Sequence, residues 1–188
     1  MPSRKTRAWL DGIEYRSHTE YRWAVFFKNL AIGARYETQG FVTDDEPYLP
    51  DFSAWPALGR LWIEVKGDWE DDPEGVARWR RWAAQRPQPS RTVLLSGDPA
   101  LEAKCIVIGG DENADDPLKG PWEDDTMQWR PCVSGHHFDL CFPGLFRGKF
   151  VEDGCPDDFG GNGEEQIRKA VEAALSHRFG KASRKKAA

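Results

Sequence analysis

A carboxylate and an amine stand two residues apart in an otherwise apolar segment of the chain. In residues 61–67, Leu-Trp-Ile-Glu-Val-Lys-Gly, the alternation of a strand would put Glu64 and Lys66 on one face. The opposite face would be uniformly apolar, which favours a central strand. Burying these charges is costly unless they are paired or bound to a metal. The pair therefore predicts either a metal-dependent site or, as the ordinary interpretation of Glu-x-Lys, a salt bridge on an edge strand.

Two upstream acids could join this site. Asp51 follows Pro50, a pair typical of turns, but the flanking Tyr48, Leu49 and Phe52 suit a strand better. On a strand beside residues 61–66, Asp51 could reach the same end of the sheet as Glu64.

The third acid is Glu20, which follows Ser17 by three residues. This spacing predicts a capping box, in which Glu20 reaches back to the Ser17 N–H. Glu20 also precedes Trp23 by three residues, which places it on the buried stripe of a helix facing the sheet. Both interpretations stay open.

Periodicity gives the elements that must position these residues. A helix begins near Ser17, with Trp23, Phe26, Phe27 and Leu30 on one apolar face and Gly33 ending it. A second helix follows the acidic residues 68–74 and ends before Pro87. Strands are expected over residues 35–42, 48–54, 61–66, 91–96 and 104–108. The order predicts an α/β fold with a mixed central sheet.

Pro50-Asp51 and Glu64-Val65-Lys66, in this context of strands and helices, resemble the PD-(D/E)XK nuclease superfamily. The resemblance covers roughly residues 15–110, and residues 16–27 also look like the opening helix of phage- and mobile-element-associated members. It implies a restriction-endonuclease-like core (αβββαβ) with helices flanking the sheet. Residues 1–110 would form this core, and residues 111–188 would be a C-terminal extension packed on it.

The resemblance also implies roles for the residues. Asp51, Glu64 and the Val65 carbonyl would ligate Mg²⁺, with Mn²⁺ as a substitute, because hard cations prefer oxygen ligands. Lys66 would orient the attacking water and stabilise charge on the phosphate, and Glu20 would hold a metal water or a second ion. The expected function is a metal-dependent endonuclease that hydrolyses phosphodiester bonds of DNA, including structured or branched DNA. The alternative is a catalytically silent nuclease-like module that binds DNA or protein.

The C-terminal third contains a second group of metal-ligand types. A zinc knuckle is one interpretation, although C-x₂-C is absent and intracellular cysteines are often small buried hydrophobes. A Ser134–His137–Asp139 triad is disfavoured, because near neighbours in a loop rarely form one. The candidate Zn²⁺ ligands are Cys132, His136, His137, Cys141 and Cys155.

Two further features of this third are an acidic tract and a helix. The tract Asp111–Asp125 could be a protein-docking or DNA-mimicking surface, or simply a solvated loop. A last helix is expected from Asn162, with Glu165 completing a capping box.

Composition limits the classes of protein. With 188 residues, of which 39% are hydrophobic and 12% aromatic, the chain can bury a core. A net charge of −5 argues against non-specific coating of nucleic acid, but local clusters of basic residues could contact DNA phosphates. The candidates are Arg16, Arg22, Lys181, Arg184 and Lys185.

Hydropathy gives an expectation for where the protein is located. No apolar run reaches the roughly 18–20 residues of a membrane span, and no signal peptide is visible, so a cytoplasmic protein without a membrane partner is expected. A homodimer would suit a cut through both DNA strands, but no interface can be recognised in the sequence.

Overall fold

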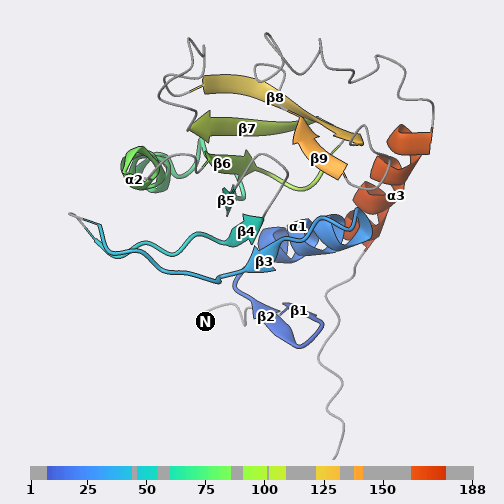
Figure 1. Ribbon diagram of the computed structural model, residues 1–188, viewed down its shortest axis with the longest axis horizontal. Helices are drawn as coiled ribbons and strands as arrows, with labels where there is room; N and C mark the ends of the chain where they lie inside the picture. Colours follow the sequence, from blue (N-terminus) through green and yellow to red (C-terminus); the bar gives the residue numbers. More distant parts are fainter. Residues whose placement is uncertain are drawn as a thin grey trace, which may run out of the picture.

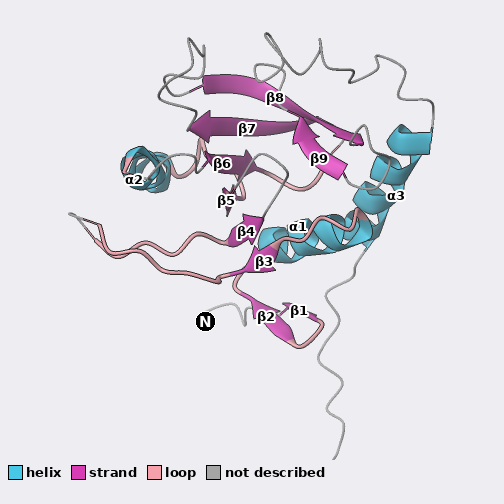
Figure 2. Cartoon of the chain, in the orientation of Figure 1, coloured by secondary structure: helices cyan, strands magenta, loops and turns pink. Residues whose placement is uncertain are grey.

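The computed structural model describes residues 8–43, 46–54, 60–85, 91–100, 102–108, 122–131, 138–141 and 162–176. These residues form a mixed sheet of seven strands with helices on both of its faces (Figures 1 and 2). The α/β class and the mixed central sheet expected from the sequence are thereby confirmed. A separate two-stranded hairpin, β1 (Ala8–Leu10) and β2 (Ile13–Tyr15), precedes the first helix.

Strands follow one another across the sheet in chain order. β5 and β6 are parallel, whereas the other neighbouring pairs of this sheet are antiparallel. A parallel pair needs a crossover connection, and α2 (Pro73–Ala84) provides it. The strands are β3 (Arg35–Tyr36), β4 (Phe52–Ala54), β5 (Leu61–Lys66), β6 (Arg91–Ser96), β7 (Glu102–Ile108), β8 (Trp122–Pro131) and β9 (Phe138–Cys141).

The two faces of β5 contribute to two different apolar clusters. Leu61, Ile63 and Val65 pack with residues of α1 (His18–Asn29) and α3 (Asn162–Ser176). Trp62 packs on the other face with the Trp79 and Trp82 side chains of α2. The alternation expected for this strand is confirmed, and it leaves Glu64 and Lys66 on the α2 face at the end of the strand.

Helix α1 is anchored by its cap and by its aromatic stripe. The Ser17 hydroxyl accepts a hydrogen bond from the Glu20 N–H at 3.1 Å, as expected of an N-cap serine. The indole N–H of Trp23 donates to the Gly97 carbonyl at 2.9 Å, which ties the helix to the loop after β6. The expected apolar face is buried: Trp23, Phe26, Phe27 and Leu30.

The expected end of this helix at Gly33 is wrong. The helix ends at Asn29, with Leu30 as its C-cap. Ala31 takes the left-handed conformation (φ 54°) that the glycine was expected to provide. The Ile32 N–H then returns to the Phe27 carbonyl at 2.9 Å, and the partly buried Ile32 side chain packs on the core. Burial of Ile32 therefore explains why the helix ends at Asn29 and does not continue to Gly33.

The strands before the site are shorter than expected. Residues 35–42 do not form one strand: β3 ends at Tyr36, and Glu37 has a positive φ of 44°. The chain continues as an arm that returns through an isolated bridge between Phe41 and Tyr48. β4 likewise begins at Phe52, after the site residue Asp51.

Residues beyond position 110 extend the same sheet, with β8 beside β7 and β9 beside β8. Residues 122–125 of the acidic tract, considered above as part of a loop, lie in β8. Helix α3 starts at Asn162 as expected, and its Ile167, Ala170 and Ala174 side chains are buried in the core cluster shared with α1. None of the described helices has the length and apolar character needed to cross a bilayer.

Candidate metal centre

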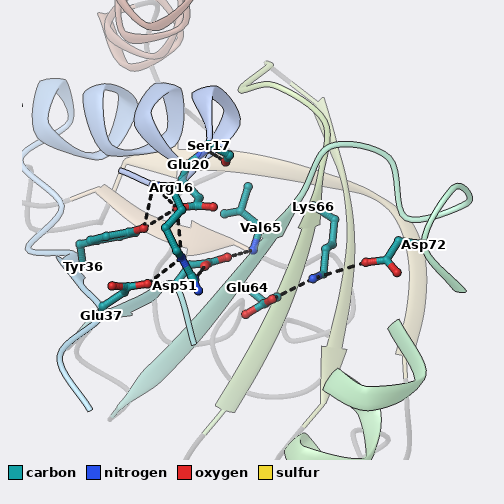
Figure 3. Close-up of polar contacts among 10 residues, drawn as sticks. All are labelled: Arg16, Ser17, Glu20, Tyr36, Glu37, Asp51, Glu64, Val65, Lys66 and Asp72. Carbon is teal, nitrogen blue, oxygen red and sulfur yellow. Dashed lines mark hydrogen bonds and ion pairs between the residues drawn. The ribbon is translucent and has the colours of Figure 1, made fainter. Parts of the chain in front are cut away.

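Asp51 and Glu64 are brought together by the pairing of β4 with β5. Phe52 is opposite Ile63 in this antiparallel pair, so Asp51, just before Phe52, and Glu64, just after Ile63, lie at the same end of it, where their charges interact (Figure 3). Antiparallel partners present their side chains on the same face of a sheet. Both residues are buried, with 2% of Asp51 and 6% of Glu64 exposed. The sheet therefore places two carboxylates next to each other out of bulk water.

Both carboxylate oxygens of Asp51 have a partner. The Val65 N–H donates to Oδ2 at 2.8 Å, and Arg16 Nη2 donates to Oδ1 at 2.7 Å (Figure 3). The Arg16 Nε also pairs with Glu37 Oε1 at 2.7 Å. Arg16, considered above as a DNA contact, is therefore an internal counter-ion of Asp51, and Val65 meets Asp51 through its N–H.

Glu20 approaches the same region from α1. Its Oε2 accepts a hydrogen bond from the Tyr36 hydroxyl at 2.5 Å and another from the Arg16 N–H at 3.2 Å. In a capping box the Glu20 carboxylate would accept from the Ser17 N–H, but here it accepts from the Arg16 N–H. Glu20 is also buried. It therefore lies on the buried stripe of the helix and also accepts a hydrogen bond from a backbone N–H at the start of the helix, so both interpretations describe it.

Lys66 connects the strand to the following helix. Its Nζ lies 3.1 Å from Glu64 Oε1 and 3.6 Å from Asp72 Oδ2 (Figure 3). Asp72 is the N-cap of α2, where its side chain accepts a hydrogen bond from the Gly75 N–H at 3.0 Å. The ammonium group is consequently held beside the carboxylates by a residue that also starts the helix.

The electrostatics of the site disfavour two ionised acids. Burial raises the pKa of Asp51 well above its ordinary value, and the neighbouring charges of Glu64 and Glu20 raise it further. Burial likewise raises the pKa of Glu64, although Lys66 opposes this shift. A divalent cation between the two carboxylates would remove both the repulsion and much of the desolvation penalty.

The buried polar atoms on the α2 side that lack a hydrogen bond of ordinary geometry among the described residues include Glu64 Oε2 and the Tyr48 hydroxyl, two groups close enough to shift the pKa of each other. Unpaired buried oxygens of this kind are available to a ligand or to ordered water. An oxygen-only set of two carboxylates, one with an unused oxygen, fits a hard cation that retains several of its waters. Within the described residues, however, no three His, Cys, Asp or Glu side chains are close enough to chelate one ion together.

The residues proposed for catalysis, Glu20, Asp51, Glu64 and Lys66, therefore gather at one end of β4 and β5, whereas the other candidates do not join them. Arg22 pairs with Asp98, beyond β6. Of the zinc candidates, Cys141 is in β9 and the others lie outside the described residues, as do Lys181, Arg184 and Lys185. The site residues that the sequence interpretation missed are Tyr36, Glu37, Tyr48 and Asp72.

Only one of these missed residues carried a readable signal. Asp72 directly precedes Pro73, and an Asp before a proline at the first helical position is typical of an N-cap. Tyr36 ends β3, and Glu37 and Tyr48 belong to the arm and its return, a path that local periodicity does not describe.

Comparisons with known proteins give no family for the chain, which matches no protein-family model, no curated protein and no solved structure.

Proposed function

We propose that the chain is a metal-dependent endodeoxyribonuclease with a restriction-endonuclease-like core of the PD-(D/E)XK type. The observation that carries the proposal is the buried pair Asp51–Glu64, with Lys66 Nζ 3.1 Å from Glu64. Burying two adjacent carboxylates and an amine carries a large desolvation penalty, so the stability of the fold does not by itself explain this arrangement. They are the groups required to bind a divalent cation next to a phosphodiester.

Each side chain has a separate task in the proposed reaction. Asp51 and Glu64 would hold Mg²⁺, which would lower the pKa of a water and offset charge on the scissile phosphate. Lys66 would orient the attacking water and stabilise the charge that builds on the phosphate oxygens. Glu20, fixed by Tyr36, adds negative charge next to Asp51 and so strengthens the attraction for a cation.

Cleavage by purified protein tests the proposal. Supercoiled plasmid and a four-way DNA junction would be incubated with the chain in Mg²⁺, in Mn²⁺ or in EDTA. We expect nicking or cutting that needs the metal and is lost in Glu64→Gln. Lys66→Met should lower the rate by roughly 10²–10³-fold, the effect of removing one group that stabilises transition-state charge.

A matched control is Glu165→Gln, which alters an exposed carboxylate on α3 that pairs only with Lys169 among the described partners of its side chain. It should cleave as the unsubstituted chain does. Cleavage that survives Glu64→Gln, or that does not need a divalent ion, would contradict the proposal, because a contaminating nuclease would then explain the activity.

The second candidate is a catalytically silent module that binds DNA or protein. It is favoured by one observation, the Arg16 guanidinium already paired with Asp51 Oδ1 at 2.7 Å. If that pair is permanent, Asp51 is unavailable to a metal. Calorimetric titration with Mn²⁺ distinguishes the two candidates, because a silent module should show no cation site that depends on both Asp51 and Glu64.

A further inference from the structure

Tyr48 is a buried residue of the arm between β3 and β4, close to Glu64 of the candidate metal centre. Only 4% of it is exposed. Its N–H and carbonyl both pair with Phe41 across the arm, at 2.8 and 2.7 Å. Its backbone is therefore held on both sides, and Asp51 follows three residues later.

The ring of Tyr48 is held by stacking. It lies on the indole of Trp82 with ring centres 4.6 Å apart and planes 16° from parallel. The Arg78 guanidinium lies 5.5 Å from the centre of the same ring. Both contacts come from α2, and offset stacking and cation–π contacts each favour one orientation of a ring. The direction of the hydroxyl is thereby set by the fold.

That hydroxyl is directed at the acids of the site. Burial raises the pKa of Tyr48, and the charges of Glu64 and Asp51 raise it further, so the phenol keeps its proton and can donate. The hydroxyl and Glu64 Oε2 are both buried and make no hydrogen bond of ordinary geometry among the described residues, yet the two side chains lie close enough for a hydrogen bond between them to shift the pKa of each.

We propose that Tyr48 is a positioning residue of the candidate metal centre, which orients Glu64 by donating the hydrogen of its hydroxyl to that carboxylate. The inference rests on the proposed function, because the orientation of Glu64 matters to cation binding and catalysis. A purely structural role would be served equally by phenylalanine, whose ring makes the same stack on Trp82.

The test compares Tyr48→Phe with Tyr21→Phe. Tyr21 is a tyrosine on α1 that is also buried and whose ring contacts Tyr15, so the control removes the same atom from another part of the core. Three quantities would be measured for each: Mn²⁺ affinity by calorimetry, kcat and KM for junction DNA, and the melting temperature without metal.

For Tyr48→Phe we expect Mn²⁺ affinity and kcat to fall by about 10- to 100-fold, the usual effect of losing a group that orients a metal ligand. KM for DNA and the melting temperature should stay unchanged, since the stack is retained. Tyr21→Phe should leave affinity and kcat unchanged.

Wild-type affinity and turnover in Tyr48→Phe would overturn this inference while leaving the proposed function intact. A lower melting temperature with unchanged Mn²⁺ affinity would also overturn it, because it would identify Tyr48 as a residue of the core alone. Absence of both metal binding and cleavage in the unsubstituted chain would instead contradict the proposed function, and this inference with it.

Discussion

Asp51 accepts hydrogen bonds from a guanidinium and a backbone amide, and the first of these donors competes with any metal ion. Arg16 Nη2 lies 2.7 Å from Oδ1, but more than half of the Arg16 side chain is exposed. An arginine so placed has access to solvent, whereas the Val65 N–H is fixed in β5. Arg16 therefore neutralises the buried acid in the free protein and can leave when a cation or a DNA phosphate arrives.

Arg16→Ala tests this competition. Without metal, we expect the free energy of unfolding to fall by about 1.5–3 kcal/mol, because Asp51 loses a hydrogen bond from a charged donor. Mn²⁺ should bind more tightly than to the unsubstituted chain, since no guanidinium has to be displaced. Denaturant unfolding and calorimetry measure the two effects. Lys28→Ala, which removes an exposed pair with Asp11, is the control; weaker Mn²⁺ binding in Arg16→Ala would contradict the competition.

The raised pKa values of Asp51 and Glu64 predict an unusual pH dependence. The folded protein binds more protons than the unfolded chain at pH values above the ordinary pKa values of 3.8 and 4.5 and below the raised ones. The stability contributed by these two groups is therefore complete below about pH 4 and is lost as the pH rises through the raised values.

Mg²⁺ should reverse this loss, because it binds the ionised carboxylates. We expect the rise in melting temperature on adding Mg²⁺ to be larger at pH 8 than at pH 5. At a Mg²⁺ concentration a hundred times the dissociation constant, the free energy of unfolding should increase by about 2.7 kcal/mol. Glu64→Gln should abolish the difference between the two pH values. An equal effect of Mg²⁺ at both would argue that the ion binds elsewhere.

At the scale of elements, the turn after β6 links the site strand to α1. Gly97 has a φ of 77°, its N–H donates to the Lys66 carbonyl at 2.9 Å, and its carbonyl accepts from the Trp23 indole. A side chain in this region of φ is strained even though a Cβ there would meet only the Gly67 carbonyl oxygen, at 3.7 Å.

Gly97→Ala should lower the free energy of unfolding by about 1–2 kcal/mol, the cost of a left-handed conformation for an L-residue. The urea midpoint measures this effect. Gly33→Ala, a glycine without a positive φ and with open space at Cβ, should change it little. Equal effects at the two glycines would refute the conformational explanation.

Elements whose pattern depends on local periodicity could be predicted from the sequence. Strands 61–66 and 91–96 have the expected bounds because strand-forming residues run there between segments that contain proline and glycine. The Ser17 cap and the two faces of β5 were also predictable. The arm was not, because positive φ at Glu37 and the Phe41–Tyr48 bridge are tertiary features. Strands β8 and β9 lie in acidic or Gly-rich sequence, where the pairing of β8 with β7 and of β9 with β8 is not visible in the pattern.

The candidate site likewise contains residues that the sequence could place and residues that it could not. Asp51, Glu64 and Lys66 could be placed together because strand register is a short-range rule. Arg16 could be named but was expected to contact DNA, since its partner Asp51 is 35 residues away. Tyr48 was read only as a residue favouring a strand, because its contacts with Trp82 and Arg78 depend on how α2 packs on the sheet.

At the scale of the whole molecule, the last described helix completes the core behind the site. Ala170 and Ala174 of α3 are almost fully buried, in the cluster that also contains Trp23 and Phe27 of α1. Small side chains allow two helices to approach closely. The C-terminal third therefore supports α1, which carries Glu20, in addition to extending the sheet.

Ala174→Leu should lower the free energy of unfolding by about 1–3 kcal/mol through overpacking. Glu172→Ala on the exposed side of the same helix should stay within about 0.5 kcal/mol of the unsubstituted chain. Urea denaturation measures both. If Ala174→Leu proved neutral, the packing of α3 on α1 would not contribute to the stability of the core.

Calorimetric titration of Mn²⁺ into the unsubstituted chain, Asp51→Asn and Glu64→Gln is the most direct test of a cation held by these two carboxylates. We predict one site in the unsubstituted chain that is lost in either variant, with both variants still folded by circular dichroism. No binding to the unsubstituted chain, or binding that persists in both variants, would contradict a shared site and leave the pair as a buried ion network without a metal.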